Sequence, residues 1–387
     1  MHKDKYVFAQ LTSFLDRNKF NYIVRKYDGD RYVKHFTCWN QLLALMFGQL
    51  SNRESLRDLI LALDAHYSKS YHLGLGKNVS KSSLARANQD RDYHIFEEYA
   101  YYLVNEARQK RVSDIFKLDG NVYAFDSTTI DLCLSVFWWA KFRKKKGGIK
   151  VHTLYDVETQ IPAFFHFTEA SVHDSNAMKV IPYESGSYYI FDRAYNNFRM
   201  LNKIHQIGSF FVVRAKKNLQ CKAIRWKRRF PKNVLSDATI ELTGFYPRQY
   251  YPEHLRLVRF WDEEQKREFV FLTNAMQISA LQVAELYKNR WQVELFFKWL
   301  KQHLKIKKFW GTTENAVRIQ IYVSICTYCL VAIVQNDMQL DRSTYEVLQI
   351  LSISLTDKTH LRDLFDRTKF QNDKEHFRLN EPILFDF

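Results

Sequence analysis

Four polar residues at fixed spacing follow Ser279 in a stretch with helical periodicity: Tyr287, Arg290, Glu294 and Lys301. At about 100° per residue they project within about 60° of one another, and the apolar residues around them project to the opposite side. A phenol, two cations and a carboxylate on one helix face could bind phosphates and a metal ion. The same face could instead be solvated, with Arg290 and Glu294 as an ordinary i,i+4 ion pair. The spacing alone leaves both interpretations open.

Two aspartates in otherwise apolar predicted strands are the second candidate group. Asp126 lies in YAFDSTT, and Asp192 ends the run YYIFD. A carboxylate buried in a strand is costly unless it is paired or bound to a metal. Each aspartate therefore has a salt-bridge partner, lies at an exposed strand end, or shares a cation with the other. Asp131, Asp156 and Asp174 also lie near predicted strand ends and compete for such a role.

The net charge indicates what such a site would act on. The chain has 58 Lys and Arg against 42 Asp and Glu, a formal net charge of +16, so nucleic acid is the first candidate partner. Asp126, Asp192 and Glu294 could together hold two Mg²⁺ or Mn²⁺ ions, because these hard cations take oxygen ligands. Two such ions would clamp the attacking and leaving oxygens of a phosphoryl transfer, while Arg290 and Lys301 would bind flanking phosphates.

The acids need a framework, and the chain after Val122 has the pattern of strands. Five short runs rich in β-branched and aromatic residues begin near residues 122, 149, 161, 187 and 209. The first three are joined by segments too short for crossover helices, which predicts antiparallel pairing. A short helix closed by Gly208 separates the last two runs and implies parallel pairing. Polar, strand-like residues 216–275 follow, and then one helix from Ser279 to about Leu304.

The first 115 residues have helical patterns instead. Ser51 and Glu54 match a capping box and predict the start of a second helix there. Ser80 is the predicted N-cap of KSSLARANQD, a possible recognition helix whose Lys81 and Arg86 could contact DNA. The alternative is a helical domain that packs on the catalytic core or mediates dimer contacts.

The spaced residues resemble the signature of the DDE transposases of bacterial insertion sequences, in particular those of insertion sequence family four. That signature is Y-x2-R-x3-E-x6-K, and Tyr287, Arg290, Glu294 and Lys301 meet every spacing. The resemblance covers about residues 120 to 335. It implies an α/β fold with an RNase H-like mixed-sheet catalytic core, interrupted by a β-rich insertion and preceded by an N-terminal all-helical domain.

The resemblance also assigns the acids and divides the chain. It implies that three carboxylates are catalytic and bind metal: Asp126, Asp192 and Glu294. Around the second aspartate the family has a D-x-G-Y-like element, which reads DRAY here, with Ala194 in place of the usual glycine and Tyr195 completing it. The implied domains are a helical DNA-binding domain (1–117), the first part of the core (118–215), the β-rich insertion (216–275), the second part of the core (276–340) and a helical tail (341–387).

The activity that the resemblance implies is cut-and-paste transposition. A metal-bound water cleaves DNA at the terminal inverted repeats, the freed 3′-hydroxyl forms a hairpin, and the ends join target DNA. Tyr287, Arg290 and Lys301 would bind phosphates of the DNA end. Double-stranded DNA would be the partner, a homodimer would form in the DNA complex, and no small-molecule cofactor is expected. Two alternatives remain: a metal-dependent DNA endonuclease without transposition, and a DNA-binding regulator with a degenerate catalytic core.

Basic residues outside the signature extend the expected DNA surface. Residues 141–146 contain five basic residues, among them Arg143, Lys144 and Lys145. Residues 225–229 contain four around Trp226, which could stack on a base although core packing is its alternative. Lys150 lies on the strand expected beside Asp126 and could face a phosphate. Each of these features could equally be a solvated loop or have a structural role.

Other classes of protein are disfavoured. The longest uncharged apolar run, residues 321–334, suits a buried helix better than a bilayer span of about 20 residues, and the N-terminus lacks the pattern of a signal peptide. Five scattered cysteines point to a reducing compartment. Cys326 and Cys329 lie inside the apolar run, where core packing is favoured over metal binding. We therefore expect a cytoplasmic protein, nucleoid-associated when bound to DNA, with no membrane partner.

Overall fold

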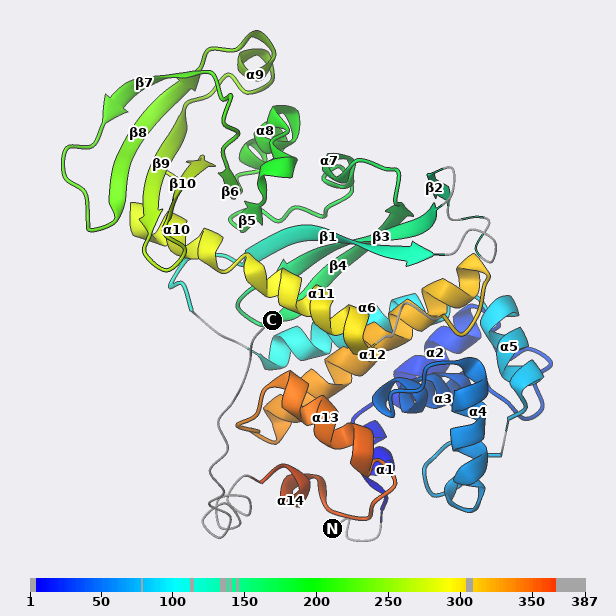
Figure 1. The fold of residues 1–387 in the computed structure, drawn as a ribbon. Helices are drawn as coiled ribbons and strands as arrows, with labels where there is room; N and C mark the ends of the chain where they lie inside the picture. Colours follow the sequence, from blue (N-terminus) through cyan, green and yellow to red (C-terminus); the bar gives the residue numbers. More distant parts are fainter. Residues whose placement is uncertain are drawn as a thin grey trace. The chain divides into compact units, whose positions relative to one another are not determined.

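The computed structural model describes residues 5–366, apart from residues 78, 112–114, 133–136, 138, 140, 144–145 and 304–308. The chain divides into two compact units, one of residues 1–100 and 318–387 and the other of residues 101–317. The boundaries fall inside two long helices, α6 (His94–Lys110) and α12 (Glu314–Asp337). Figure 1 traces both units along the sequence. The finer division at residues 117, 215, 275 and 340 stays a prediction.

A ten-stranded mixed sheet forms the centre of the unit of residues 101–317. Its strands have the order β2-β3-β1-β5-β6-β10-β9-β8-β7, and β4 pairs with β3 off this path. The strand bounds are β1 (Val122–Leu132), β2 (Lys141–Arg143), β3 (Lys146–Asp156), β4 (Ile161–Glu169), β5 (Tyr188–Phe191), β6 (Phe210–Arg214), β7 (Cys221–Trp226), β8 (Val234–Leu242), β9 (Leu255–Asp262) and β10 (Arg267–Thr273).

The half of the sheet built from β1, β3, β4, β5 and β6 has the topology expected from the sequence. β1 pairs antiparallel with β3, and β3 pairs antiparallel with β4. β5 runs parallel to β1, and β6 runs parallel to β5. The crossover helix α8 (Phe198–Gln206) joins β5 to β6 and ends before Gly208, whose φ of +80° suits a helix terminus. The predicted α/β fold with an RNase H-like mixed sheet is confirmed.

The strand-rich segment after β6 continues the same sheet. Its last strand, β10, pairs antiparallel with β6, with Leu272 opposite Val213. β9, β8 and β7 then follow as successive antiparallel neighbours, and the short helix α9 (Phe245–Tyr250) connects β8 to β9. This segment is therefore anchored on a core strand through main-chain hydrogen bonds, and β7 becomes an edge of the whole sheet.

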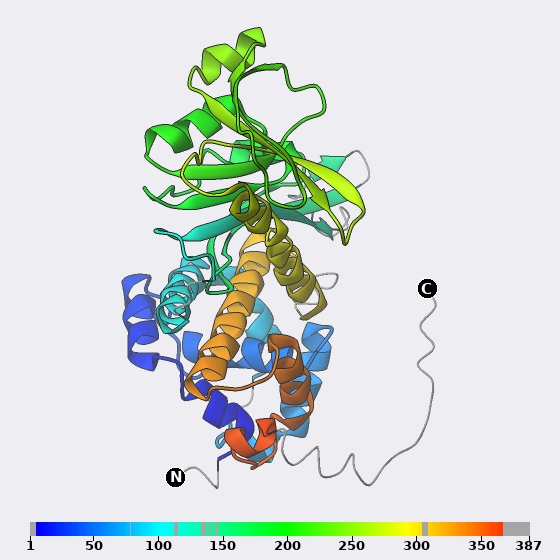
Figure 2. The ribbon, with the colours of Figure 1, turned by 90° about the vertical axis from the view of Figure 1, so that its left-hand side faces the viewer.

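Helices cover both faces of the core half of the sheet. α7 (Asp174–Ala177) and α8 lie over one face, and α11 (Trp291–His303) crosses the other face along β1 (Figures 1 and 2). Burial on both faces explains why the strand YYIF is apolar without alternation. One buried cluster joins α8 to the sheet, and its fully buried members include Leu201 and Ile204 of α8 with Tyr123, Phe125, Tyr189 and Phe191 of the strands.

The helix expected from Ser279 to about Leu304 is two helices, α10 (Ala280–Lys288) and α11. Ser279 caps α10 as part of a capping box with Gln282. The side chain of Asn289 explains the break, because its amide donates to the carbonyl oxygen of Glu285 at 2.9 Å while its carbonyl accepts from the amide of Gln292 at 2.9 Å. The prediction of one continuous helix is wrong, and a two-residue turn at positions 289–290 separates the halves.

The other unit is helical throughout its described part, as expected for the N-terminal region. Its first helices are α1 (Val7–Thr12), α2 (Arg17–Lys26), α3 (Cys38–Leu50), α4 (Leu56–Ala65) and α5 (Lys81–Asp90), and its last are α13 (Thr344–Ser354) and α14 (Leu361–Phe365). Ser80 caps α5 as predicted, through a bond from the Ser83 N–H at 3.1 Å. The start predicted at Ser51 is wrong, because Ser51 ends α3 and Ser55 caps α4.

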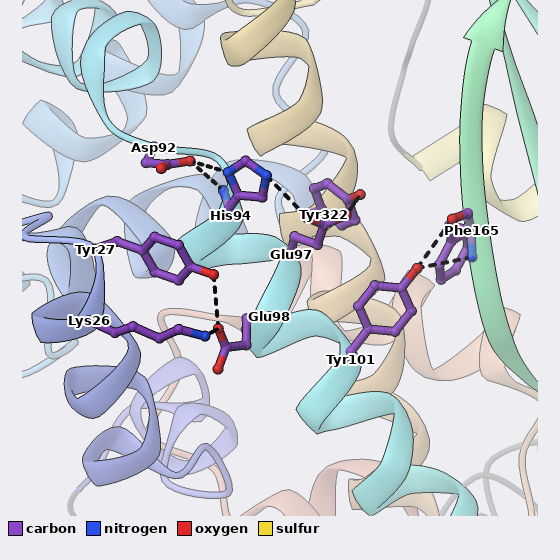
Figure 3. Close-up of polar contacts among 9 residues, drawn as sticks. All are labelled: Lys26, Tyr27, Asp92, His94, Glu97, Glu98, Tyr101, Phe165 and Tyr322. Carbon is purple, nitrogen blue, oxygen red and sulfur yellow. Dashed lines mark hydrogen bonds and ion pairs between the residues drawn. The ribbon is translucent and has the colours of Figure 1, made fainter.

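Polar contacts connect the helices of this unit. The amide of Gln41 on α3 donates to Asn88 on α5 at 2.7 Å and accepts from Arg91 at 2.9 Å. On α6, Glu98 binds both Lys26, at 2.6 Å, and the hydroxyl of Tyr27 (Figure 3). These contacts hold α5 and α6 in place with hydrogen bonds where apolar packing alone would be non-directional.

The apolar run predicted to be a buried helix forms the middle of α12. This helix is long and apolar enough to cross a membrane, but 94% of its most apolar stretch is buried in the protein. Cys326 and Cys329 are fully buried within it, and burial raises the pKa of the Cys326 thiol well above its usual value. Core packing of this C-x-x-C pair is confirmed.

Candidate active site

Two parallel strands bring the two aspartates together. The register of β1 and β5 places Phe125 opposite Phe191, so the next residues along the two strands, Asp126 and Asp192, lie side by side. β1 continues beyond this point, whereas β5 ends and Asp192 begins a short 3-10 turn, Arg193–Tyr195. The backbone N–H of Ser127 donates to Asp126 Oδ1 at 2.8 Å.

The turn contains Ala194, where the family has glycine. Its φ is not positive, unlike that of eight other non-glycine residues in the described chain. Alanine is therefore accommodated without strain, because only a left-handed backbone would require glycine here. Tyr195, which completes the element, is buried against the ring of Phe125 at a centroid distance of 5.3 Å.

The helix pair α10–α11 adds the third acid and a cation. Glu294 lies in the first turn of α11, which packs against β1. Arg290, in the turn before α11, reaches two acids at once: Nη1 lies 2.9 Å from Asp126 Oδ2, and Nη2 lies 2.5 Å from Glu294 Oε1. A guanidinium with two outer nitrogens can bridge two carboxylates in this way. The i,i+4 pair is present, but it belongs to a network with a strand residue 164 positions away.

Tyr287 connects Asp192 to the same helix pair. Its hydroxyl donates to Asp192 Oδ1 at 3.2 Å, and its ring packs on Phe271 at a centroid distance of 4.8 Å. The alternative of a fully solvated helix face is therefore wrong, because Tyr287 is buried and the Arg290 side chain is only 15% exposed. Tyr287 and Arg290 thus contact Asp192 and Asp126, whereas Glu294 and Lys301 are exposed.

Burial and neighbouring charge set the ionisation of these groups. Burial raises the pKa of Asp126 to about 6, opposed by the Arg290 charge and the Ser127 N–H and reinforced by the charges of Glu294 and Asp192. Burial likewise raises the pKa of Tyr287 to about 12. For Arg290, burial is outweighed by Asp126, Tyr287 and Glu294, so its pKa is raised and it stays charged. Glu294 and Asp192 are thus each close enough to Asp126 for their charges to affect its ionisation.

The donor chemistry of the three acids suits a hard divalent cation, because every candidate ligand is a carboxylate oxygen. The present arrangement of the three acids does not suit such a cation, since the guanidinium of Arg290 lies between Asp126 and Glu294. Among the residues that the structure describes, no group of three or more His, Cys, Asp or Glu side chains is placed to hold a metal ion.

The competing aspartates have other partners. Asp156 is buried and pairs with Arg108 at 3.0 Å, and Asp131 is exposed at the end of β1. Asp174 accepts from the Ser127 hydroxyl at 2.7 Å and pairs with Lys150 at 3.0 Å. These contacts make Asp156 and Asp174 structural acids.

Lys150 is placed away from the three acids. It lies opposite Thr129 in the β1–β3 register, and side chains at Ser127 and Thr129 project to the face opposite Asp126 because strand residues alternate. Besides Asp174, its ammonium donates to the carbonyl oxygen of Val172 at 2.7 Å. These contacts favour a structural role for Lys150, which is the alternative that the sequence left open.

A cavity of about 590 Å³ adjoins Asp192, and sequence reasoning missed most of its lining. Its wall contains Phe269, with the guanidinium groups of Arg214 at 5.0 Å and Arg267 at 4.4 Å from the ring centroid. Tyr287 and Arg290 also border it. Arg214 is the last residue of the predicted strand SFFVVR, which lies next to the strand that precedes Asp192. This position is the feature of the sequence that could have indicated Arg214 as a residue of the site.

The expected DNA-binding residues are spread over both units. Trp226 on the edge strand β7 is 61% exposed. Core packing, which the sequence left open as the alternative to base stacking for Trp226, is therefore wrong. Lys81 and Arg86 are exposed on α5. Lys144, Lys145 and the side chain of Arg143 lie outside the described residues.

Comparison with known proteins agrees with this geometry. Residues 117–330 match the family model described as Transposase DDE domain, and residues 3–76 match one described as Domain of unknown function (DUF4372). The first match contains β1, β5 and α11 and therefore all three acids. The chain belongs to the DDE transposases.

Similar proteins are named for the same activity. A protein of Sinorhizobium fredii named as a transposase is 34% identical over 62% of this chain and 66% of its own length. A Geobacillus stearothermophilus protein named as the transposase for insertion sequence element IS5377 is 29% identical over 75% of this chain and 80% of its own length. A Synechocystis protein named as a transposase for insertion sequence element IS4SA is 22% identical over 73% of this chain and 80% of its own length. These names agree with the predicted resemblance to insertion-sequence transposases, so the predicted transposase class is confirmed.

Proposed function

We propose that this transposase cleaves DNA at the terminal inverted repeats of an insertion sequence and joins the freed ends to target DNA by cut-and-paste transfer through a hairpin intermediate. The observation that carries the proposal is the network Asp126–Arg290–Glu294 with Tyr287–Asp192, which joins two strands and two helices around three acids. Three carboxylates at this position match the chemistry of phosphodiester cleavage.

Each residue of the network has a proposed role. Asp126, Asp192 and Glu294 would hold the two divalent ions, Mg²⁺ or Mn²⁺, that the family's chemistry uses. When bound, such ions activate the attacking oxygen and stabilise the leaving oxygen. Arg290 would bind a phosphate of the DNA end with its fork, and Tyr287 would orient the Asp192 carboxylate by its hydrogen bond.

Double-stranded DNA is the substrate that fits the net charge of +16. We propose three contact regions: Lys301 beyond the acids on α11, Trp226 within the basic segment 225–229, and Lys81 with Arg86 on α5. The basic segment 141–146, with Arg143, Lys144 and Lys145, would add a fourth region, because its strand β2 and the strand β7 lie at opposite ends of the strand order. A homodimer would bind the two element ends, and the protein would work at the bacterial nucleoid without a small-molecule cofactor.

Incubation of a labelled terminal-repeat duplex with a supercoiled target plasmid and Mg²⁺ tests this function. The proposal predicts a hairpin species and plasmid-joined products that depend on the divalent ion. Cleavage without joined products would favour a metal-dependent endonuclease. Binding without cleavage would favour a DNA-binding regulator, the remaining alternative.

A further inference from the structure

The three acids are already occupied by side-chain and backbone donors. Asp126 accepts at both oxygens, from the Ser127 N–H at 2.8 Å and from Arg290 Nη1 at 2.9 Å. Glu294 Oε1 accepts from Arg290 Nη2, and Asp192 Oδ1 accepts from the Tyr287 hydroxyl. The helix pair α10–α11 thus carries both the third acid and the groups that cover the acids.

Arg290 and a divalent ion would compete for the same oxygens. A guanidinium between Asp126 and Glu294 uses lone pairs that an ion bridging them would need. Its positive charge would also repel the ion at close range. This explains why the described residues offer carboxylate ligands of the right chemistry without a formed metal site.

The bonds of Arg290 to the acids leave one of its own donors unused. Arg290 Nε is buried and has no hydrogen-bond partner among the described residues. A buried N–H without a partner has lost its hydrogen bonds to water and gained none in exchange, so the guanidinium is not fully satisfied where it lies. A phosphate oxygen can accept from Arg Nε and an outer nitrogen together in a bidentate pair, and could therefore satisfy it better.

The surroundings of Arg290 allow such an exchange. The residue lies in the turn between α10 and α11, where the helical hydrogen-bond ladder is interrupted. It also borders the cavity of about 590 Å³ beside Asp192, whose lining includes neither Asp126 nor Glu294, so there is space next to Arg290 apart from those two acids. Trp291 and Lys288 next to it are exposed, which leaves the turn accessible to a DNA backbone.

We propose that Arg290 is a latch that occupies the acids until a DNA phosphate takes its guanidinium, so that the ions bind after the DNA end. The proposal rests on the proposed function of the three acids. It adds an order of assembly: without DNA the acids bind Mn²⁺ weakly, and the DNA end strengthens that binding. By linkage, Mn²⁺ strengthens DNA binding by the same factor.

Mn²⁺ binding to the full chain, measured by electron paramagnetic resonance of the free ion, tests the latch without any need for catalysis. The variants are Arg290→Ala and Arg290→Lys, and Arg267→Ala is the control, because Arg267 borders the same cavity and its loss changes the net charge equally. Each protein is titrated alone and with a blunt duplex bearing the terminal repeat. Mn²⁺ bound by the duplex alone is subtracted, and thermal melts confirm that each variant folds.

The latch predicts that Arg290→Ala binds Mn²⁺ about tenfold more tightly than the wild type without DNA, within the usual range of coupling factors. The duplex should tighten binding to the wild type and to Arg267→Ala, with little further effect on Arg290→Ala. Arg290→Lys keeps the positive charge but loses the two-pronged guanidinium, so its Mn²⁺ affinity without DNA should be closer to that of Arg290→Ala than to that of the wild type.

Two results would overturn the latch while leaving the proposed function in place. One is Mn²⁺ binding by Arg290→Ala equal to that of the wild type. The other is Arg290→Lys matching the wild type while Arg290→Ala and Arg267→Ala bind equally tightly, which would mean that net charge alone sets the affinity. Absence of saturable Mn²⁺ binding in every protein, with and without the duplex, would instead overturn the proposed metal site and the latch with it.

Discussion

The hydroxyl of Tyr287 donates a hydrogen bond to the carboxylate of Asp192, 3.2 Å away, across 95 residues of chain. The ring that carries this hydroxyl is packed on Phe269 and Phe271 of β10. The strand-rich segment therefore has a direct part in the site, because it supports the side chain that orients an acid of the core.

Replacing Tyr287 with Phe removes this hydrogen bond and keeps the ring packing. We expect strand cleavage to fall about tenfold, which corresponds to roughly 1.4 kcal/mol, with a loss of folding stability of about 1 kcal/mol or less. Cleavage rates and urea melts measure the two effects. Tyr251→Phe is the control, because it loses a hydrogen bond to His205 at 2.8 Å away from the acids. Wild-type cleavage by Tyr287→Phe would remove Tyr287 from the site.

Lys150 and Lys301 should behave oppositely when each is changed to Met. Lys150→Met leaves Asp174 without its ion-pair partner at 3.0 Å, so we expect a loss of about 1–3 kcal/mol in stability and unchanged DNA affinity. Lys301 is exposed, so its change should leave stability intact and reduce the salt dependence of DNA binding by about one unit of slope. Urea denaturation measures the stability of each variant, and DNA binding at several salt concentrations measures its affinity and salt dependence. Reversed behaviour would return Lys150 to the DNA surface.

His152 makes folding stability sensitive to mild acid. It is fully buried, and burial lowers its pKa to about 4. Its folded-state pKa lies below the unfolded value near 6.5, so the unfolded chain binds the extra proton first as the pH falls. Stability should therefore decrease from about pH 6.5 to pH 4, by on the order of 3 kcal/mol for this residue. Urea denaturation of wild type and His152→Gln across that range measures it. An equal decrease in both proteins would contradict the assignment.

Trp226 should matter for binding single-stranded DNA and not for folding. Because it is exposed on an edge strand, Trp226→Ala should change stability by no more than about 0.5 kcal/mol. Loss of base stacking should weaken oligonucleotide binding by about 1–3 kcal/mol. Ile224→Ala, an exposed apolar residue of the same strand, is the matched control. Equal binding by both variants and the wild type would exclude stacking at Trp226.

The sequence indicated the strands and the helix that carry the three acids because these elements depend on local rules. Asp126 lies within β1 and Asp192 directly follows β5, and the parallel register of these two apolar strands brings the two aspartates together. The helix carrying Glu294 was predicted from periodicity, and the helix does pack on β1. Core strands and capped helices were predictable for the same reason, since burial and capping leave a periodic pattern.

The sequence did not reveal how the side chains around the acids are arranged. Projection on one ideal helix placed Tyr287 and Arg290 on an outer face, but the helix is interrupted at Asn289 and both side chains contact the aspartates. Alternation along β3 does not say which face lies toward Asp126, so the role of Lys150 stayed open until the register was known. Such features depend on single hydrogen bonds and on strand register, which composition and spacing do not encode.

The central claim is that Asp126, Asp192 and Glu294 form one active site for DNA cleavage. The most direct test is single-turnover cleavage of a terminal-repeat duplex with Mg²⁺ by Asp126→Asn, Asp192→Asn and Glu294→Gln, with duplex binding measured in parallel. We predict that each variant still binds the duplex and that each loses cleavage by about a thousandfold or more, as expected for acids acting as a unit. Cleavage at the wild-type rate by any one of the three, in a folded and DNA-bound protein, would contradict the claim.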